Sequence, residues 1–235
     1  WRTAGIEHAR EVRDLLGGDY YVDYADDNYA DGKKVGLGDI IAYHNNTTVD
    51  WFGAFLQGQY DTEKINLYGM GGISTIGYTY KDHFSVEKEL VKADAITTFQ
   101  VKGGGRYNLD DRLSAFANVG YVQKPPILDN VIAYDGTVST DPDNEKFTST
   151  EIGGEYRSES VAIKGSYYNT KWNDRNLTKS VTTGQGDSGD TDIIYLTGVN
   201  QSHSGVEVES KIALHEMVDL DVAVSIGDWY FDGDA

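Results

Sequence analysis

The chain has 235 residues, of which 39% are hydrophobic, and a formal net charge of -18. This length is enough for one large all-β domain or two small ones. No apolar run approaches the ~20 residues of a membrane-spanning helix, so the sequence predicts no helical membrane anchor. The absence of cysteine excludes disulfides and thiol catalysis. The strong negative charge argues against binding nucleic acid, because phosphate would be repelled.

Residues 1–48 lack the pattern of the rest of the chain. Apolar residues at helical spacing predict a helix over 3–16 that stops at Gly17. An acidic, tyrosine-rich stretch follows. We therefore predict a partly helical loop region over 1–48 and a separate region over 49–235.

From residue 49 onward, alternate residues are apolar over eight segments, and this alternation predicts β-strands. The predicted strands are 49–60, 65–80, 95–107, 112–122, 146–157, 160–172, 193–214 and 218–231. Connections after the first, third, fifth and seventh strands are short, and those after the second, fourth and sixth are long. Antiparallel transmembrane β-barrels have this alternation of short and long connections.

The predicted strands have two faces of opposite character. In the last hairpin, Val206, Val208, Ile212 and Leu214 share one face with the apolar residues of 218–226. In a barrel such faces meet the lipid and the lumen. The charged residues predicted to face the lumen, where they contact a plug or are solvated, are Glu151, Glu155, Arg157, Lys164, Glu207, Glu209, Lys211, Asp219 and Asp221.

The sequence therefore predicts an all-β fold, an antiparallel up-and-down segment of a transmembrane β-barrel, with 1–48 as a partly helical extracellular loop region. The first strand begins and the last ends on the side of the long loops. We therefore expect about eight strands of a larger wall rather than a complete small barrel. A soluble β-sandwich is the alternative, because it also consists of alternating strands.

Several segments, in this order, resemble TonB-dependent outer-membrane receptors. They are Phe116–Tyr121 with Lys124-Pro125-Pro126, Asn144–Lys146 with Glu151–Arg157, then Tyr167–Arg175, Gly198–Glu209 and Ser225–Trp229. The resemblance implies a fragment of the C-terminal half of a barrel of about 22 strands in a Gram-negative outer membrane. It also implies that the plug domain and the TonB-contact segment lie outside this stretch.

The function that the resemblance implies is transport rather than catalysis. Such a receptor binds a scarce ligand with extracellular loops and imports it by energy-coupled active transport. The implied partners are the TonB complex through the plug, a surface lipoprotein, outer-membrane lipid, and a small-molecule or oligosaccharide ligand of the siderophore, corrinoid or glycan class. The alternative function is a surface carbohydrate-binding or adhesion module of the β-sandwich type.

Aromatic residues expected in loops are the candidate ligand-binding residues, because Tyr and Trp bury large areas at low entropic cost. They are Tyr20, Tyr21, Tyr24, Tyr29, Trp172 and Trp229. Loop packing or a membrane-interface belt is the alternative. The sequence predicts no catalytic residues, no metal site and no cofactor, although the acidic loop with Asp187, Asp190 and Asp192 offers oxygen ligands for calcium. A solvated acidic loop is the alternative there.

Overall fold

The computed structural model describes residues 2–13, 18, 20–21, 34–84, 90–133, 136–140, 142–183 and 190–233. The strands are β1 Arg2–Glu11, β2 Tyr20–Tyr21, β3 Lys34–Val35, β4 Ile40–Asp61, β5 Ile65–Asp82, β6 Leu90–Lys92, β7 Ile96–Asn108, β8 Leu113–Lys124, β9 Glu145–Arg157, β10 Val161–Thr183, β11 Asp190–His215 and β12 Val218–Asp232. A one-turn helix, α1 Leu128–Val131, precedes β9. Within the described parts of the chain, no helix is long and apolar enough to cross a membrane.

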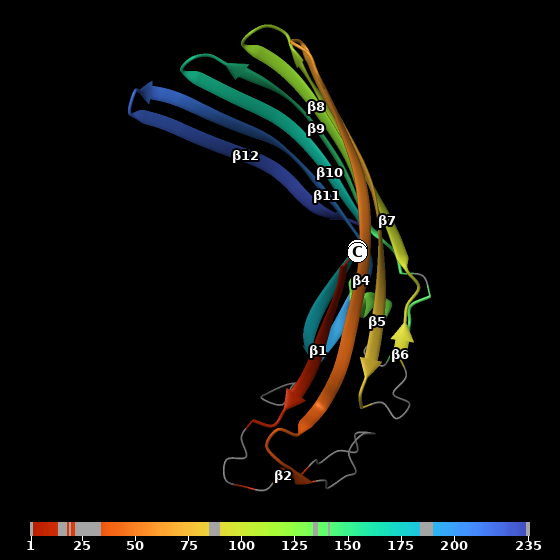
Figure 1. Cartoon of the computed structure of the whole chain (residues 1–235). Coiled ribbons are helices and arrows are strands. Elements are labelled where there is room, and N and C mark those ends of the chain that lie inside the picture. The colour runs from red at the N-terminus through yellow and green to blue at the C-terminus, as the bar shows by residue number, and fades with distance from the viewer. Residues whose placement is uncertain are drawn as a thin grey trace. The chain divides into compact units, whose positions relative to one another are not determined.

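One large sheet contains most of these strands, in the order β1-β4-β5-β7-β8-β9-β10-β11-β12, with β6 paired to β5 (Figure 1). Apart from β6 and the short strands β2 and β3, spatial neighbours are chain neighbours, which is the up-and-down topology that the sequence predicts. The predicted strand 218–231 corresponds to β12, and 65–80 corresponds to β5. Short β2 and β3 pair separately. A β-sandwich needs two large packed sheets, so the sandwich alternative does not describe these residues.

The predicted helix over 3–16 is wrong over residues 3–11, because the structure forms strand β1 there; residues 14–16 lie outside the described residues. β1 pairs antiparallel with β4, from Arg2 opposite Trp51 to Glu11 opposite Ile40. So short a helix is marginal by itself, whereas pairing with β4 satisfies main-chain groups along both strands. β4 also runs across residue 48, the predicted end of the loop region. That 1–48 and 49–235 are separate domains remains a prediction.

The predicted loop over 173–192 is also wrong for much of its length. β10 continues to Thr183 and β11 begins at Asp190, and these two residues are paired. The end of β10 consists of β-branched residues, which favour strands: Val181, Thr182 and Thr183. This preference prevails over the polar composition of the segment.

The chain divides into two compact units. The first unit contains 1–52, 75–97 and 127–142, and the second contains 53–74, 98–126 and 143–235. The first unit has a small hydrophobic core in which α1 and the segment after it pack on β5 and β6. Its buried residues are Tyr78, Tyr80, Ala93, Val131 and Ile132.

A histidine pair links three segments of the first unit. The rings of His44 on β4 and His83 after β5 stack with centroids 4.2 Å apart. His44 Nε2 lies 2.7 Å from the Oε1 atom of Glu7 on β1, and His83 Nε2 contacts Asn46 Oδ1. Burial lowers the pKa of His83, and His44 acts in the same direction. This shift favours the neutral form of the His83 imidazole.

The second unit confirms the two predicted faces. Directly opposed residues of antiparallel strands share a face, so the register places Lys164 with Glu155 and Glu209 on one polar face. The opposite, apolar face exposes large side chains. They include Ile152, Tyr156, Ile163, Tyr167, Val206, Val208, Leu220, Val222, Val224 and Ile226.

The turn between β7 and β8 is closed by an aspartate. Oδ1 of Asp110 accepts hydrogen bonds from the backbone N–H groups of Arg112 and Leu113, each 2.8 Å long. Both bonds lower the pKa of Asp110 below its ordinary value of 3.8, and the bond from the Arg112 N–H has the larger effect. An ionised carboxylate is the stronger acceptor, which explains the direction of the shift.

The stabilisation from Asp110 is expected to depend on pH. Because its pKa is lower in the folded state, the contribution is complete above the ordinary pKa and is lost as the pH falls through the lowered value. In urea unfolding of the full-length protein, Asp110→Ala should therefore be less stable than the unmodified protein at about pH 6, and the difference should shrink below about pH 4. Asp111→Ala, which removes a carboxylate that does not accept these bonds, is the control. A difference that is constant with pH would contradict this assignment.

Candidate functional site

Four aromatic side chains gather on the polar face of the second unit. The register aligns Trp172, Gln201 and Phe231 in one row, and Thr170, His203 and Trp229 in the next. Tyr168 heads the following row, and the indole N–H of Trp229 donates to its hydroxyl oxygen over 3.1 Å. We call Tyr168, Trp172, Trp229 and Phe231 the aromatic patch. Trp229 and Phe231 lie on β12, the edge strand of the described sheet, and each is 62% exposed.

Glycines on the neighbouring strands make room for one of these rings. A Cβ atom at Gly205 of β11 or at Gly227 of β12 would lie 2.7 Å from the hydroxyl oxygen of Tyr168. Tyr168 therefore lies across two strands where no side chain stands in its way. Because real Cβ atoms essentially never approach so closely, larger residues at these two positions would displace the tyrosine.

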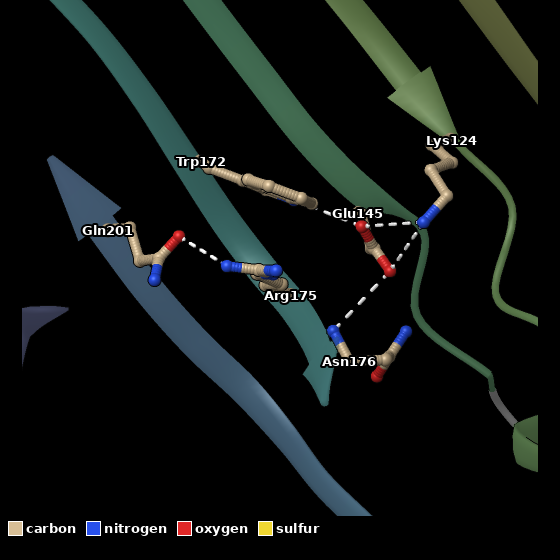
Figure 2. A network of polar contacts seen from close by, with 6 residues as sticks. All are labelled: Lys124, Glu145, Trp172, Arg175, Asn176 and Gln201. Atoms are coloured by element: carbon tan, nitrogen blue, oxygen red, sulfur yellow. Dashed lines mark hydrogen bonds and ion pairs between the residues drawn. The ribbon is translucent and has the colours of Figure 1, made fainter. Parts of the chain in front are cut away.

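A buried carboxylate contacts Trp172 at one end of the aromatic patch (Figure 2). Glu145, the first residue of β9, is 1% exposed. Lys124 Nζ lies 3.2 Å from both carboxylate oxygens, and the indole N–H of Trp172 donates to Oε2 over 3.0 Å. The backbone N–H of Asn176 donates to Oε1 over 3.4 Å. Charge-assisted bonds of this kind offset the cost of burying a carboxylate.

An arginine lies flat on the supported indole. The guanidinium carbon of Arg175 is 4.0 Å from the centroid of the Trp172 ring, within the range of a cation–π contact. Its Nη1 donates to the side-chain oxygen of Gln201 over 2.7 Å. Phe147 packs against the same indole, with centroids 4.3 Å apart. The arrangement combines a planar cation with aromatic surface.

A bulge in β10 places Arg175 in this position. The pairing with β11 shifts between Trp172 and Arg175, and Asp174 between them has a positive φ of 55°. Asp174 is held by Lys146 Nζ at 2.7 Å and by the side-chain oxygen of Asn200, which accepts from its backbone N–H over 3.1 Å. Bulges re-aim side chains next to functional sites. The bulge explains why Arg175 reaches the ring of Trp172.

A second polar network lies on the same face, towards the short turns. Glu155 contacts Arg106 at 2.9 Å and Arg157 at 2.6 Å. Glu151 accepts from Asn118 over 3.0 Å and lies 3.6 Å from Lys164. A hollow of about 350 Å³ is lined by Arg106, Asn118, Glu155 and Lys164, among others. Four of the charges predicted to face the lumen, Glu151, Glu155, Arg157 and Lys164, thus take part in these networks.

The structure separates the predicted ligand-binding residues. Trp172 and Trp229 share the polar face and lie in β10 and β12 rather than in loops. Trp172 is the last residue of the strand predicted over 160–172, which the structure extends to Thr183, and Trp229 lies inside the strand predicted over 218–231. That they bind a ligand remains a prediction. Tyr20 and Tyr21 form β2, whereas Tyr24 and Tyr29 lie outside the described residues.

The calcium prediction remains a prediction. Asp190 and Asp192 belong to β11, and Asp187 lies outside the described residues. Within the parts of the chain that the structure describes, no group of three or more His, Asp or Glu side chains is arranged to hold a metal ion.

Sequence reasoning missed Glu145, Arg175 and Tyr168. Period-two alternation along β10 already puts Tyr168 and Trp172 on one face. No local signal could pair Glu145 with Trp172, because this contact depends on the register between two strands.

The large antiparallel sheet, with one apolar exposed face and one polar face carrying charge networks, defines the wall of an outer-membrane β-barrel. The family model described as "TonB dependent receptor-like, beta-barrel" matches residues 2–234. The chain belongs to this family of integral outer-membrane receptors of Gram-negative bacteria. The family is one of transport receptors, not enzymes.

Solved structures of receptors share the fold. The siderophore receptor PirA from Pseudomonas aeruginosa is 13% identical, with a TM-score of 0.58, and the match covers 83% of this chain and 45% of that chain. The copper transporter OprC is 18% identical at a TM-score of 0.58, over 78% and 29%. The ferric-catecholate import receptor Fiu from E. coli K12 is 14% identical at 0.58, over 85% and 30%. This chain spans less than half the length of each. No curated protein matches it.

Proposed function

We propose that this chain is the part of a TonB-dependent receptor wall that contributes the aromatic patch and Arg175 to ligand capture. The receptor imports the captured small molecule in a step driven by the TonB complex. Family membership and the fold shared with receptors named for siderophores and copper support transport of a scarce nutrient. The observation that carries the ligand site is the open aromatic surface beside a guanidinium on the polar face.

The chemistry of the patch favours a ligand with flat or ring-shaped surface. Exposed Trp229 and Phe231 offer stacking area, and Trp172 with Arg175 adds a cation in a fixed plane. Siderophore, corrinoid and glycan ligands all have such surfaces. Contacts with a surface lipoprotein and with outer-membrane lipid belong to the same proposal.

Uptake by the full-length receptor tests the proposal. A Gram-negative strain without its own receptors would be supplied with radioactive iron(III) chelates, cobalamin and a labelled oligosaccharide. We expect uptake of one of these compounds, lost in a strain without TonB. Trp229→Ala should weaken binding of that compound roughly fivefold or more, as truncating an aromatic anchor does.

Tyr156→Ala is the matched control, because Tyr156 lies on the apolar face and should leave uptake unchanged. Uptake of none of the compounds, or uptake that does not need TonB, would contradict the proposed transport. Uptake that is insensitive to Trp229→Ala and to Trp172→Ala would contradict the proposed ligand site.

A further inference from the structure

Glu145 is almost wholly buried, yet its carboxylate is contacted by groups from β8 and β10 (Figure 2). Lys124 contacts both oxygens, and Trp172 and Asn176 each donate to one of them. A buried carboxylate is strongly unfavourable unless it is paired and hydrogen-bonded. The groups that contact a buried carboxylate are therefore essential to it. One of the groups that contact Glu145 is the indole of Trp172, which belongs to the aromatic patch.

The position of Glu145 along the chain adds a second role. Lys124 is the last residue of β8 and Glu145 is the first residue of β9, so their ion pair closes the base of the 125–144 connection. The same carboxylate orients the indole of Trp172, on which Arg175 lies. The Glu145 carboxylate thus both closes the base of the 125–144 connection and orients the indole on which Arg175 lies.

We propose that Glu145 is a positioning residue that sets the plane of Trp172, and through it the guanidinium of Arg175, from the base of the 125–144 connection. Its functional meaning rests on the ligand site proposed above. Glu145 does not contact the ligand itself, because it is buried beneath the indole and the lysine. Losing it frees the indole N–H and the Lys124 ammonium, so the ring can turn and Arg175 loses its support.

Chemical modification of Arg175 tests the inference without any ligand. The full-length receptor in detergent would be treated with phenylglyoxal, which reacts with accessible guanidinium groups, and labelling of the peptide that contains Arg175 would be followed by mass spectrometry. We expect Glu145→Ala to raise the rate roughly three- to tenfold, as loss of the ring contact would. Glu145→Gln, which keeps an acceptor for the indole N–H, should restore most of the protection.

Two controls make the result specific. Glu151→Ala removes another polar-face carboxylate of β9 that contacts Asn118 and Lys164, and it should leave Arg175 labelling unchanged. Labelling of Arg157, which pairs with Glu155, should be the same in every variant. Equal labelling of Arg175 in Glu145→Ala and the unmodified receptor would overturn the inference, and so would an equal rise in Glu151→Ala.

Uptake measurements separate this inference from the proposed function. If Glu145→Ala and Trp172→Ala both lower uptake of the radioactive iron(III) chelates or of cobalamin, and Arg175 labelling rises in the first, both proposals hold. If labelling rises but neither variant changes uptake, Glu145 still positions Arg175, and the ligand site lies elsewhere.

Discussion

Replacing Val224 by arginine is expected to destabilise the receptor by about 2–4 kcal/mol, the cost of a cation on the lipid face near the middle of the bilayer. Val224 lies on the apolar face of β12, opposite Val208 of β11, and its side chain is 53% exposed. The short β11–β12 turn lies seven residues away along β12, which places Val224 well inside the apolar band. Urea unfolding of the full-length receptor in lipid vesicles would measure the loss.

The next residue of the same strand provides the matched control. Ser225 faces the other way, and its hydroxyl donates to Glu207 over 3.4 Å. An arginine at position 225 would stand beside that carboxylate on the polar face, so Ser225→Arg should cost little. If Ser225→Arg proved as destabilising as Val224→Arg, the assignment of the two faces would be wrong.

Replacing Gly153 by alanine is the second change with a large expected effect, about 1–3 kcal/mol of destabilisation from overpacking. A Cβ atom there would collide with the main-chain oxygen of Gly165 and with the ring of Phe116. The backbone oxygen belongs to the paired strand β10 and cannot move without disturbing the sheet. The folded fraction of the full-length receptor in urea would report the loss.

Gly154→Ala is the comparison, one residue further along the same strand. A Cβ atom at Gly154 would lie 3.4 Å from the oxygen of Ser114, an ordinary contact. Alanine should be tolerated there, because it also lowers the entropy of the unfolded chain. Equal stability of the two variants would show that Phe116 does not need the space above Gly153.

The sequence by itself was sufficient to identify eight strands of the wall, β4, β5 and β7 to β12, and their two faces. Alternation along a strand depends only on the chain's own geometry, so Val206 and Glu207 fall on opposite faces whichever strands lie beside them. The alternation of short and long connections, which is also a property of the sequence alone, identified the up-and-down topology. The order of several weak motifs indicated the family that the match over residues 2–234 now shows.

Tertiary structure decided the features that depend on a partner strand. β1 is a strand because β4 offers it backbone partners along most of its length, although its sequence spacing predicts a helix. β10 extends beyond Trp172, the predicted end of that strand, because it pairs with β11 as far as Thr183. Short segments of ambiguous pattern take the structure that satisfies their backbone groups.

The candidate site depends most on such long-range pairing. Glu145 lies 21 residues from Lys124 and 27 from Trp172 along the chain, yet all three meet. Their contact is set by the register of β8, β9 and β10 and by the bulge before Arg175. Side-chain direction is a local property with period two, so the sequence determines it, whereas register sums the lengths of strands, bulges and loops, and only the folded sheet determines which residues lie opposite one another.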